Sequence, residues 1–128
     1  MFKVLISDSM STVAQKIFEK YNIETEIKTG LSEEEIINII SAYEALIVRS
    51  ATKVTKNIIK AGKKLKVIGR AGAGVDNIDV VTAKEKNILV MNTPGGNTNA
   101  TAEHTLALIL SLLRKVPYSN DTTHKGKW

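Results

Sequence analysis

The stretch LKVIGRAGAGVDNID, from Leu65 to Asp79, contains the pattern that decides the fold. A short apolar run leads into a loop rich in glycine, and residues with helical spacing follow, which is the order strand, turn, helix. The run is apolar without alternation, so a strand there must be covered on both faces of its sheet. This pattern is typical of one unit in a parallel sheet with helices on both sides.

Similar units occur along the rest of the chain. Apolar runs predict five strands, over residues 3–7, 25–28, 45–48, 65–68 and 88–91. Between them lie helical patterns over residues 11–20, 55–61 and 80–86, a helix that opens at residues 31–35 with a capping box of Ser32 and Glu35, and a long helix over residues 99–115. The alternation predicts an α/β fold: a doubly wound parallel sheet of the flavodoxin-like (Rossmann-like) type, with strand order 2-1-3-4-5 and a long C-terminal linking helix.

Composition excludes several classes of protein. The chain of 128 residues has ordinary apolar and charged fractions of 43% and 24%, and it has no cysteine, which excludes disulfides and thiolate metal sites and suits a cytoplasmic location. Its longest apolar stretch, residues 106–113, is too short to cross a membrane. The net charge of +5 comes partly from lysines over residues 53–66, but no aromatic side chains lie between them, so we expect no nucleic-acid partner.

Two arginines occupy equivalent places in this scheme. Arg49 follows the third predicted strand and Arg70 follows the fourth, so both are expected at the carboxyl edge of the sheet. Two guanidinium groups repel each other unless an anion lies between them, and arginine matches carboxylate or phosphate groups well. The alternative is that each arginine pairs with a nearby acid such as Asp8 or Asp76.

The glycine loop after Arg70 favours a small anion over a dinucleotide. Gly72 and Gly74 allow the backbone to turn and to present N–H groups to a ligand. The dinucleotide pattern G-x-G-x-x-G fails because Asn77 holds its third position, and no acid ends the next strand. A small carboxylate fits this loop better than a pyrophosphate.

The segment after the fifth strand leads into the long helix. Pro94 ends the strand, and Asn97 or Thr98 can cap the helix. From residue 105 to residue 113 the helix is apolar on nearly all sides, so it must be buried by a partner surface, either another domain or another copy of the chain. The polar tail over residues 118–128 lacks periodicity and is expected to be a linker or a cut end.

Four ordered motifs together carry a family resemblance. They are VRSATKV (residues 48–54), VIGRAGAGVDNID (residues 67–79), NTPGGNT (residues 92–98) and AEHT (residues 102–105). The chain resembles the N-terminal region of the phosphoglycerate dehydrogenase type of D-isomer-specific 2-hydroxyacid dehydrogenase. The resemblance implies oxidation of 3-phospho-D-glycerate to 3-phosphohydroxypyruvate with NAD, in serine biosynthesis, by a homo-oligomeric enzyme.

The resemblance also implies roles for individual residues. Three side chains would hold the anionic groups of the substrate: Arg49, Ser50 and Arg70. Three backbone amides would bind its carboxylate: those of Ala73, Gly74 and Val75. Asn97 would shape the cleft, and Ala73, which has no hydroxyl, could meet the cofactor only through its backbone.

By this resemblance the chain is one part of a larger enzyme. Residues 1–98 would be the substrate-binding domain, residues 99–117 a helix that packs on the cofactor domain, and residues 118–128 the linker. The catalytic residues and the dinucleotide loop would lie beyond Trp128, and His104 does not match the catalytic histidine. We therefore expect the chain alone to bind no NAD and to be inactive. The alternative is a stand-alone module that binds small anions or regulates without catalysis.

Overall fold

The computed structural model describes residues 2–127. It divides into two compact units, Met1–Pro94 and Gly95–Trp128. The division falls just after the fifth strand, a few residues before the boundary expected at residue 98. Each unit is described by itself below, and the two terminal residues, Met1 and Trp128, lie outside the described part.

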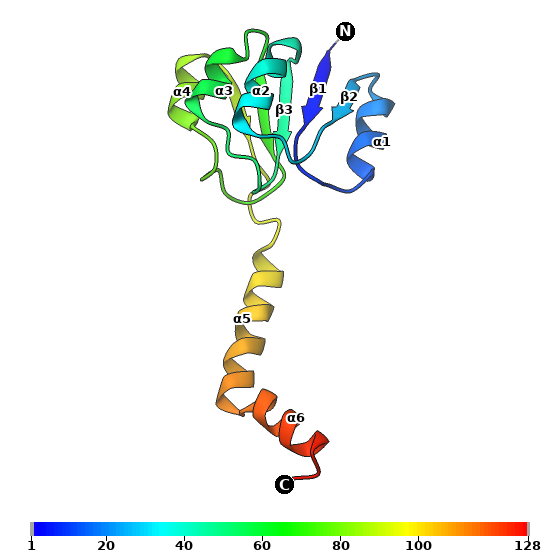
Figure 1. Cartoon of the computed structure of the whole chain (residues 1–128), viewed down its shortest axis with the longest axis vertical. Coiled ribbons are helices and arrows are strands. Elements are labelled where there is room, and N and C mark those ends of the chain that lie inside the picture. The colour runs from blue at the N-terminus through cyan, green and yellow to red at the C-terminus, as the bar shows by residue number, and fades with distance from the viewer. Residues whose placement is uncertain (1, 128) are drawn as a thin grey trace. The chain divides into compact units, whose positions relative to one another are not determined.

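The first unit is built on a parallel sheet (Figure 1). Its five strands are β1 (Lys3–Ile6), β2 (Glu24–Ile27), β3 (Ala45–Val48), β4 (Val67–Arg70) and β5 (Leu89–Met91). Their order is β2-β1-β3-β4-β5, and each neighbouring pair is parallel. The predicted doubly wound α/β fold and its strand order are therefore confirmed.

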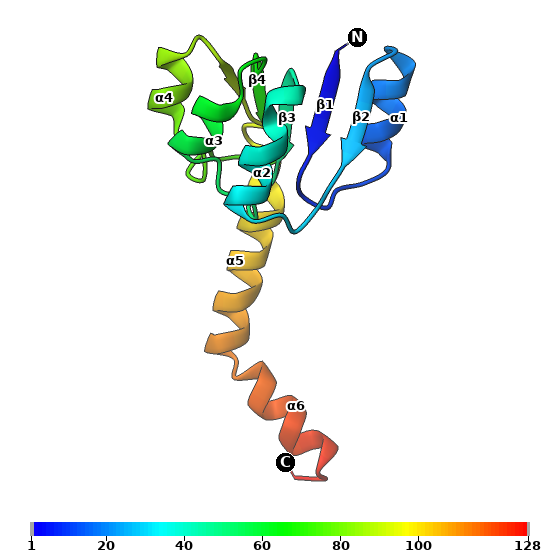
Figure 2. The same ribbon diagram turned by 45° about the horizontal axis from the view of Figure 1, so that its top comes forward.

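Helices lie on both sides of this sheet. They are α1 (Val13–Lys20), α2 (Glu33–Ile39) with a 3-10 turn at Ile40–Ala42, α3 (Lys56–Ala61) and α4 (Val80–Glu85). Helix α1 lies on one side of the sheet, and α2, α3 and α4 gather on the other (Figure 2). Right-handed crossovers require this arrangement, because the chain first moves from β1 to one edge and then returns across the sheet.

The strands alternate their side chains between two apolar clusters. Leu5, Leu46 and Val48 are fully buried on the side of α2, α3 and α4. Their neighbours in sequence, Val4 and Ile6 among them, face the opposite side, where Phe18 of α1 packs against them. Alternation with a period of two, buried on both faces, explains why the strands read as unbroken apolar runs.

Polar side chains cap the first turns of α2, α3 and α4, the helices that share one side of the sheet. The capping box of α2 is confirmed: the Ser32 hydroxyl accepts the Glu35 N–H at 3.3 Å, and the Glu35 carboxylate accepts the Ser32 N–H at 2.7 Å. Thr55 and Asp79 cap α3 and α4 in the same way, through their side-chain oxygens. These caps fix where the loops that follow β3 and β4 end.

The fourth strand lies two residues later than the sequence pattern predicted. Leu65 donates its N–H to Gly62 in a turn, so it is not part of the strand. Arg70 is the last residue of β4, where it pairs with Val48 of β3, rather than a loop residue after the strand. Its position at the carboxyl edge is unchanged.

The second unit consists of two helices, α5 (Thr98–Leu113) and α6 (Val116–His124). No helix was predicted over residues 118–128, but most of the described part of that segment forms α6; its role as a linker stays a prediction. Lys115, with φ of 50°, separates the two helices, and proline in the first turn of α6 starts it. Asn97 occupies the N-cap position of α5, but its side chain makes no capping hydrogen bond.

Helix α5 exposes the apolar side chains that the sequence led us to expect in an interface. Leu112 and Leu113 are 75% and 73% exposed, and Leu106, Leu108, Ile109 and Leu110 are about half exposed. Within the second unit of the described residues 2–127, α6 leaves them exposed. Within the same residues, no helix has both the length and the apolar character needed to span a bilayer.

Candidate anion-binding site

The two arginines meet at the carboxyl edge of the sheet. Arg49 directly follows β3, and Arg70 ends the neighbouring strand β4. The Nε of Arg70 donates to the backbone carbonyl of Arg49 at 3.3 Å, so the Arg70 guanidinium lies against the Arg49 backbone. In parallel sheets this edge is where loops and helix starts converge and where ligands bind.

A buried acid holds the loop that carries Arg49. The Asp8 carboxylate accepts the N–H of Arg49 at 2.6 Å, the N–H of Thr52 at 3.1 Å and the Thr52 hydroxyl at 2.6 Å. Burial raises the pKa of Asp8, but hydrogen bonds from Thr52 and from backbone N–H groups lower it more, so its pKa lies below the usual 3.8. Asp8 is therefore a charged acceptor built into the fold.

A half-buried amide, that of Asn77, holds the same loop from the other side. The Nδ2 of Asn77 donates to the carbonyls of Arg49 and Thr52 at 2.7 and 2.6 Å. A short parallel bridge between Val54 and Ile78 ties the two loops together nearby. The backbone of Arg49 is thus held at both polar groups: Asp8 accepts its N–H, and Asn77 and Arg70 donate to its carbonyl.

The two guanidinium groups have different partners. Arg70 forms a salt bridge with Asp76, with Nη1 and Oδ1 2.8 Å apart, so the alternative of an acid partner is correct for this residue. The Arg70 side chain is 11% exposed, whereas that of Asp76 is 83% exposed. Arg49 instead donates from Nη1 to the carbonyl of Ser9 at 3.2 Å. A ligand anion at Arg70 would compete with an exposed carboxylate.

The glycine loop presents unpaired backbone donors. The N–H groups of Ala73, Gly74 and Val75 donate to no acceptor within residues 2–127. The loop is held from behind, because Asn92 donates to the Ala73 carbonyl at 2.6 Å and Thr93 donates its N–H to Gly72 at 2.9 Å. Successive unpaired N–H groups beside a guanidinium form a site suited to a carboxylate.

A dinucleotide cofactor does not fit these residues. Asn77 fills the position of the third glycine, and its side chain is already committed to two carbonyls of the Arg49 loop. The strand β5 ends at Met91 and is followed by Asn92, so no acid stands where a ribose hydroxyl would need one. The Ala73 carbonyl, which could offer a backbone contact, accepts Asn92 instead.

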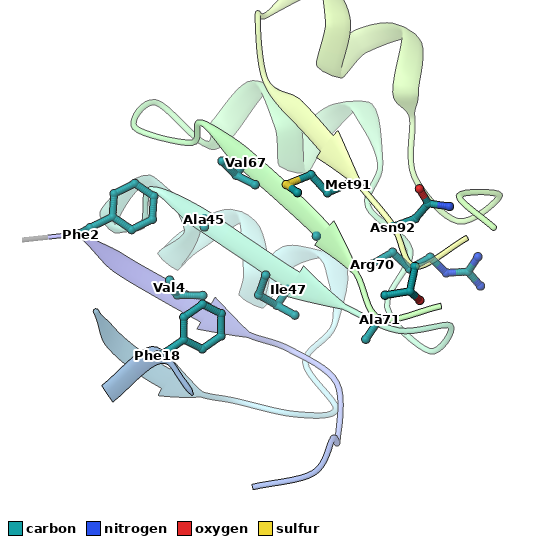
Figure 3. A pocket seen from close by; sticks show the side chains of 12 residues that line it. Phe2, Val4, Phe18, Ala45, Ile47, Val67, Arg70, Ala71, Met91 and Asn92 are labelled. Carbon is teal, nitrogen blue, oxygen red and sulfur yellow. The ribbon is translucent and has the colours of Figure 1, made fainter. Parts of the chain in front are cut away.

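A hollow on the open face of the sheet differs in character from the anion site. It has a volume of about 400 Å³, and Figure 3 shows apolar side chains from β1, β3, β4, β5 and α1 around it, with the Arg70 guanidinium pointing away from them. Its lining is nearly all carbon, so it lacks donors for an anion. It lies where α1 leaves the sheet uncovered, and we assign it no ligand.

The remaining predicted residues lie in two places. Ser50 follows Arg49 in the same loop and is exposed, which leaves its hydroxyl open to solvent. Asn97 belongs to the second unit, as the N-cap of α5, and its role in a cleft stays a prediction.

Sequence reasoning did not find the contacts that three structural residues make in the site, although it named Asp8 as a possible partner of an arginine side chain. Asp8 had a usable signal, because an acid directly after a buried strand stands at the carboxyl edge. Asn77 and Asn92 had no such signal in the sequence. Their side chains donate to backbone carbonyls of other loops, and these partners are known only from the tertiary structure.

Comparison with known proteins identifies the family. The model of the D-isomer specific 2-hydroxyacid dehydrogenase catalytic domain matches residues 4–125. The chain belongs to the D-isomer specific 2-hydroxyacid dehydrogenase family. This assignment agrees with the resemblance carried by the four motifs.

Two similar proteins of this family carry the same name. The chain is 52% identical over 128 residues to D-3-phosphoglycerate dehydrogenase from Synechocystis and 49% identical over 126 residues to that from Archaeoglobus fulgidus. It covers 100% and 98% of its own length in these matches, but only 23% and 24% of the relatives. A solved structure of NAD-bound 3-phosphoglycerate dehydrogenase from Entamoeba histolytica matches with a TM-score of 0.76 and 35% identity, covering 86% of this chain and 38% of that one.

These comparisons fix how much of a 2-hydroxyacid dehydrogenase the chain represents. It spans about a quarter of the length of the curated relatives. The part it represents contains the paired arginines and the glycine loop.

Proposed function

We propose that the chain is the substrate-binding part of an NAD-dependent D-3-phosphoglycerate dehydrogenase, acting in the cytoplasm on 3-phospho-D-glycerate. The relatives at about half identity carry this name over the whole length of the chain. The observation that carries the proposal is local: Arg49 follows β3 and Arg70 ends the neighbouring strand β4, beside three unpaired N–H groups. This arrangement recognises a small acid.

Each part of the site has a task in this proposal. The N–H groups of Ala73, Gly74 and Val75, with the Arg70 guanidinium, bind the substrate carboxylate. This fixes the hydroxyl-bearing carbon next to that carboxylate. Ser50 and Arg49 complete the polar wall, and the family resemblance gives Asn97 a part in shaping the cleft. The carbon is then held for oxidation, in which its hydrogen leaves as hydride and its hydroxyl loses a proton.

NAD supplies the hydride acceptor in the complete enzyme. The residues of this chain do not fit that cofactor, so they bind and orient the substrate only. We accordingly propose that the chain alone has no dehydrogenase activity, and that α5 packs on the cofactor domain and on a second subunit of a homo-oligomer.

The strength of substrate binding tests the proposal. Two charge-assisted contacts of about 1.5–3 kcal/mol each, less the cost of ordering, leave on the order of 4 kcal/mol, which is roughly millimolar affinity. Titration of the chain, followed by NMR, should show 3-phospho-D-glycerate shifting the backbone N–H signals of the glycine loop. NAD should shift none. Micromolar affinity for NAD, or an unmoved glycine loop, would contradict the proposal.

A further inference from the structure

A second hollow opens at the carboxyl edge, next to the arginines. Its volume is about 520 Å³, and it lies between the loop after β1 and the ends of β3, β4 and β5. It is lined by Met10, Ser11, Ala14, Arg49, Ala71 and Thr93. The β1 and β3 loops diverge here to opposite faces of the sheet, which is the switch point at which parallel sheets bind ligands.

The charge of this hollow favours an anion. Arg49 is its only charged lining residue, and none of the six is acidic. The bond from Arg49 Nη1 to the Ser9 carbonyl holds the guanidinium beside the β1 loop and uses one of its five N–H groups. The adjacent acid, Asp8, directs its oxygens to Arg49 and Thr52 in the loop after β3.

The hollow also contains a hydroxyl with an available hydrogen. Ser11 Oγ accepts the N–H of Val13 at 3.3 Å, so the oxygen is oriented as an acceptor and its own hydrogen can be donated to a ligand. Thr93 brings a second hydroxyl from the opposite wall. Met10, Ala14 and Ala71 make the rest of the lining apolar, so Arg49 and the two hydroxyls are its polar side chains.

This hollow adjoins the proposed site for the substrate carboxylate, which is formed by Arg70 and the glycine loop. Ala71 lines it, and the residues on either side of Ala71 are Arg70 and Gly72, where the glycine loop begins. A phosphorylated three-carbon acid has a carboxylate at one end and a phosphate at the other. An edge with one site at the glycine loop and another at Arg49 matches such a molecule.

We propose that this hollow, the phosphate subsite, receives the phosphate end of the substrate, and that Ser11 distinguishes phosphorylated from unphosphorylated 2-hydroxyacids. The proposal rests on the proposed function, because it assigns the other end of the same ligand. Arg49 supplies the charge, and the Ser11 hydroxyl donates a hydrogen bond to a phosphate oxygen.

The test compares two ligands on matched variants of the 128-residue chain. Dissociation constants for 3-phospho-D-glycerate and D-glycerate are measured by NMR titration for wild type, Ser11→Ala, Ser11→Thr and Ser9→Ala. Ser9 is the control, because it lies in the same loop but its side chain does not line the hollow. The backbone spectrum shows at once whether each variant is folded.

Ser11→Ala should weaken binding of 3-phospho-D-glycerate about tenfold, as expected for loss of a hydrogen bond to a charged group, and leave D-glycerate unchanged. Ser11→Thr, which keeps the hydroxyl, and Ser9→Ala should bind like wild type. Equal loss for both ligands, or none for either, overturns the phosphate subsite while the glycine-loop shifts still support the proposed function. If wild type shows no shift with either ligand, both proposals fail.

Discussion

The carboxylate of Asp8 accepts the backbone N–H of Arg49 at 2.6 Å, so one buried acid fixes the loop that carries a cation of the proposed site. It also accepts the N–H and the hydroxyl of Thr52. A charged acceptor with three donors is stronger than a neutral one, and removing it leaves buried donors unmet.

Asp8→Asn should therefore lower the free energy of unfolding by about 2–4 kcal/mol, because an amide is a weaker acceptor and directs its own N–H groups at other donors. Urea unfolding at neutral pH measures this. Asp121→Asn is the control, since Asp121 pairs with Lys125 on the surface of α6 and such pairs contribute little. If both substitutions lowered the free energy of unfolding equally, Asp8 would contribute no more to stability than a surface acid.

A second acid predicts how stability depends on pH. Hydrogen bonds from Lys28, Tyr43 and Lys3 lower the pKa of Glu26 from 4.5 to about 2. A pKa lower in the folded than in the unfolded chain stabilises the fold above pH 4.5, and this stabilisation is lost as the pH falls from 4.5 toward 2. The lowered pKa of Asp8 acts in the same direction.

Glu26→Gln should flatten the fall of the melting temperature between about pH 6 and about pH 2.5, relative to wild type. Glu24→Gln is the matched control, because Glu24 lies on the same strand and contacts the same Lys3 at a longer distance, 3.4 Å. A fall as steep in Glu26→Gln as in wild type would show that Glu26 does not account for the acid sensitivity.

Local pattern predicted the sheet well and the contacts between loops poorly. The strand Ala45–Val48 was predicted at its observed bounds because its apolar run has polar residues at both ends. The fourth strand was predicted two residues too early because Leu65 is buried although it lies in a turn before the strand. The apolar pattern alone does not distinguish a buried turn residue from a strand residue. The helix α6 was not predicted because its polar sequence has no apolar periodicity. The proline in its first turn is the one local helix signal, and alone it does not predict a helix.

The site shows the same division. Arg49 and Arg70 could be placed at one edge because each follows an apolar run predicted to be a buried strand. Their partners could not be chosen from sequence, since Asp8 and Asp76 were equally plausible acids for either arginine. Tertiary structure decides that Asp8 binds a backbone and Asp76 binds a side chain.

The salt bridge between Arg70 and Asp76 predicts a gain of affinity on mutation. The exposed Asp76 carboxylate occupies the guanidinium that the substrate carboxylate needs, so the two anions compete. Asp76→Asn should lower the dissociation constant of 3-phospho-D-glycerate about two- to fivefold, the range of an exposed ion pair, while Arg70→Ala should abolish binding. NMR titration measures both. Weaker binding by Asp76→Asn would mean that Asp76 holds Arg70 in place for the ligand.

Two glycines of the same loop give a matched pair of substitutions. A Cβ on Gly74 would lie 3.0 Å from both Arg70 Nη1 and Asp76 Oδ1, whereas a Cβ on Gly72 would lie 3.5 Å from Arg70 Nε, an ordinary contact. Gly74→Ala should therefore displace the guanidinium and weaken substrate binding severalfold, with the melting temperature nearly unchanged because the displaced atoms are at the ends of flexible side chains. Gly72→Ala should bind like wild type. Equal binding by both would show that the position of Arg70 does not limit affinity.

The exposed apolar surface of α5 predicts self-association of the chain. Leu112 and Leu113 are among its most exposed side chains, and contiguous apolar surface of this kind is rarely left in water. Sedimentation should show an apparent mass that rises with concentration. Leu112→Lys should reduce the association, because a charge buried without a partner is costly. Thr101→Lys adds the same charge at an exposed polar position of α5 and should leave the association unchanged. A wild-type chain that stays monomeric at high concentration would mean that α5 alone does not form an interface between copies, and a partner domain would then be needed to cover it.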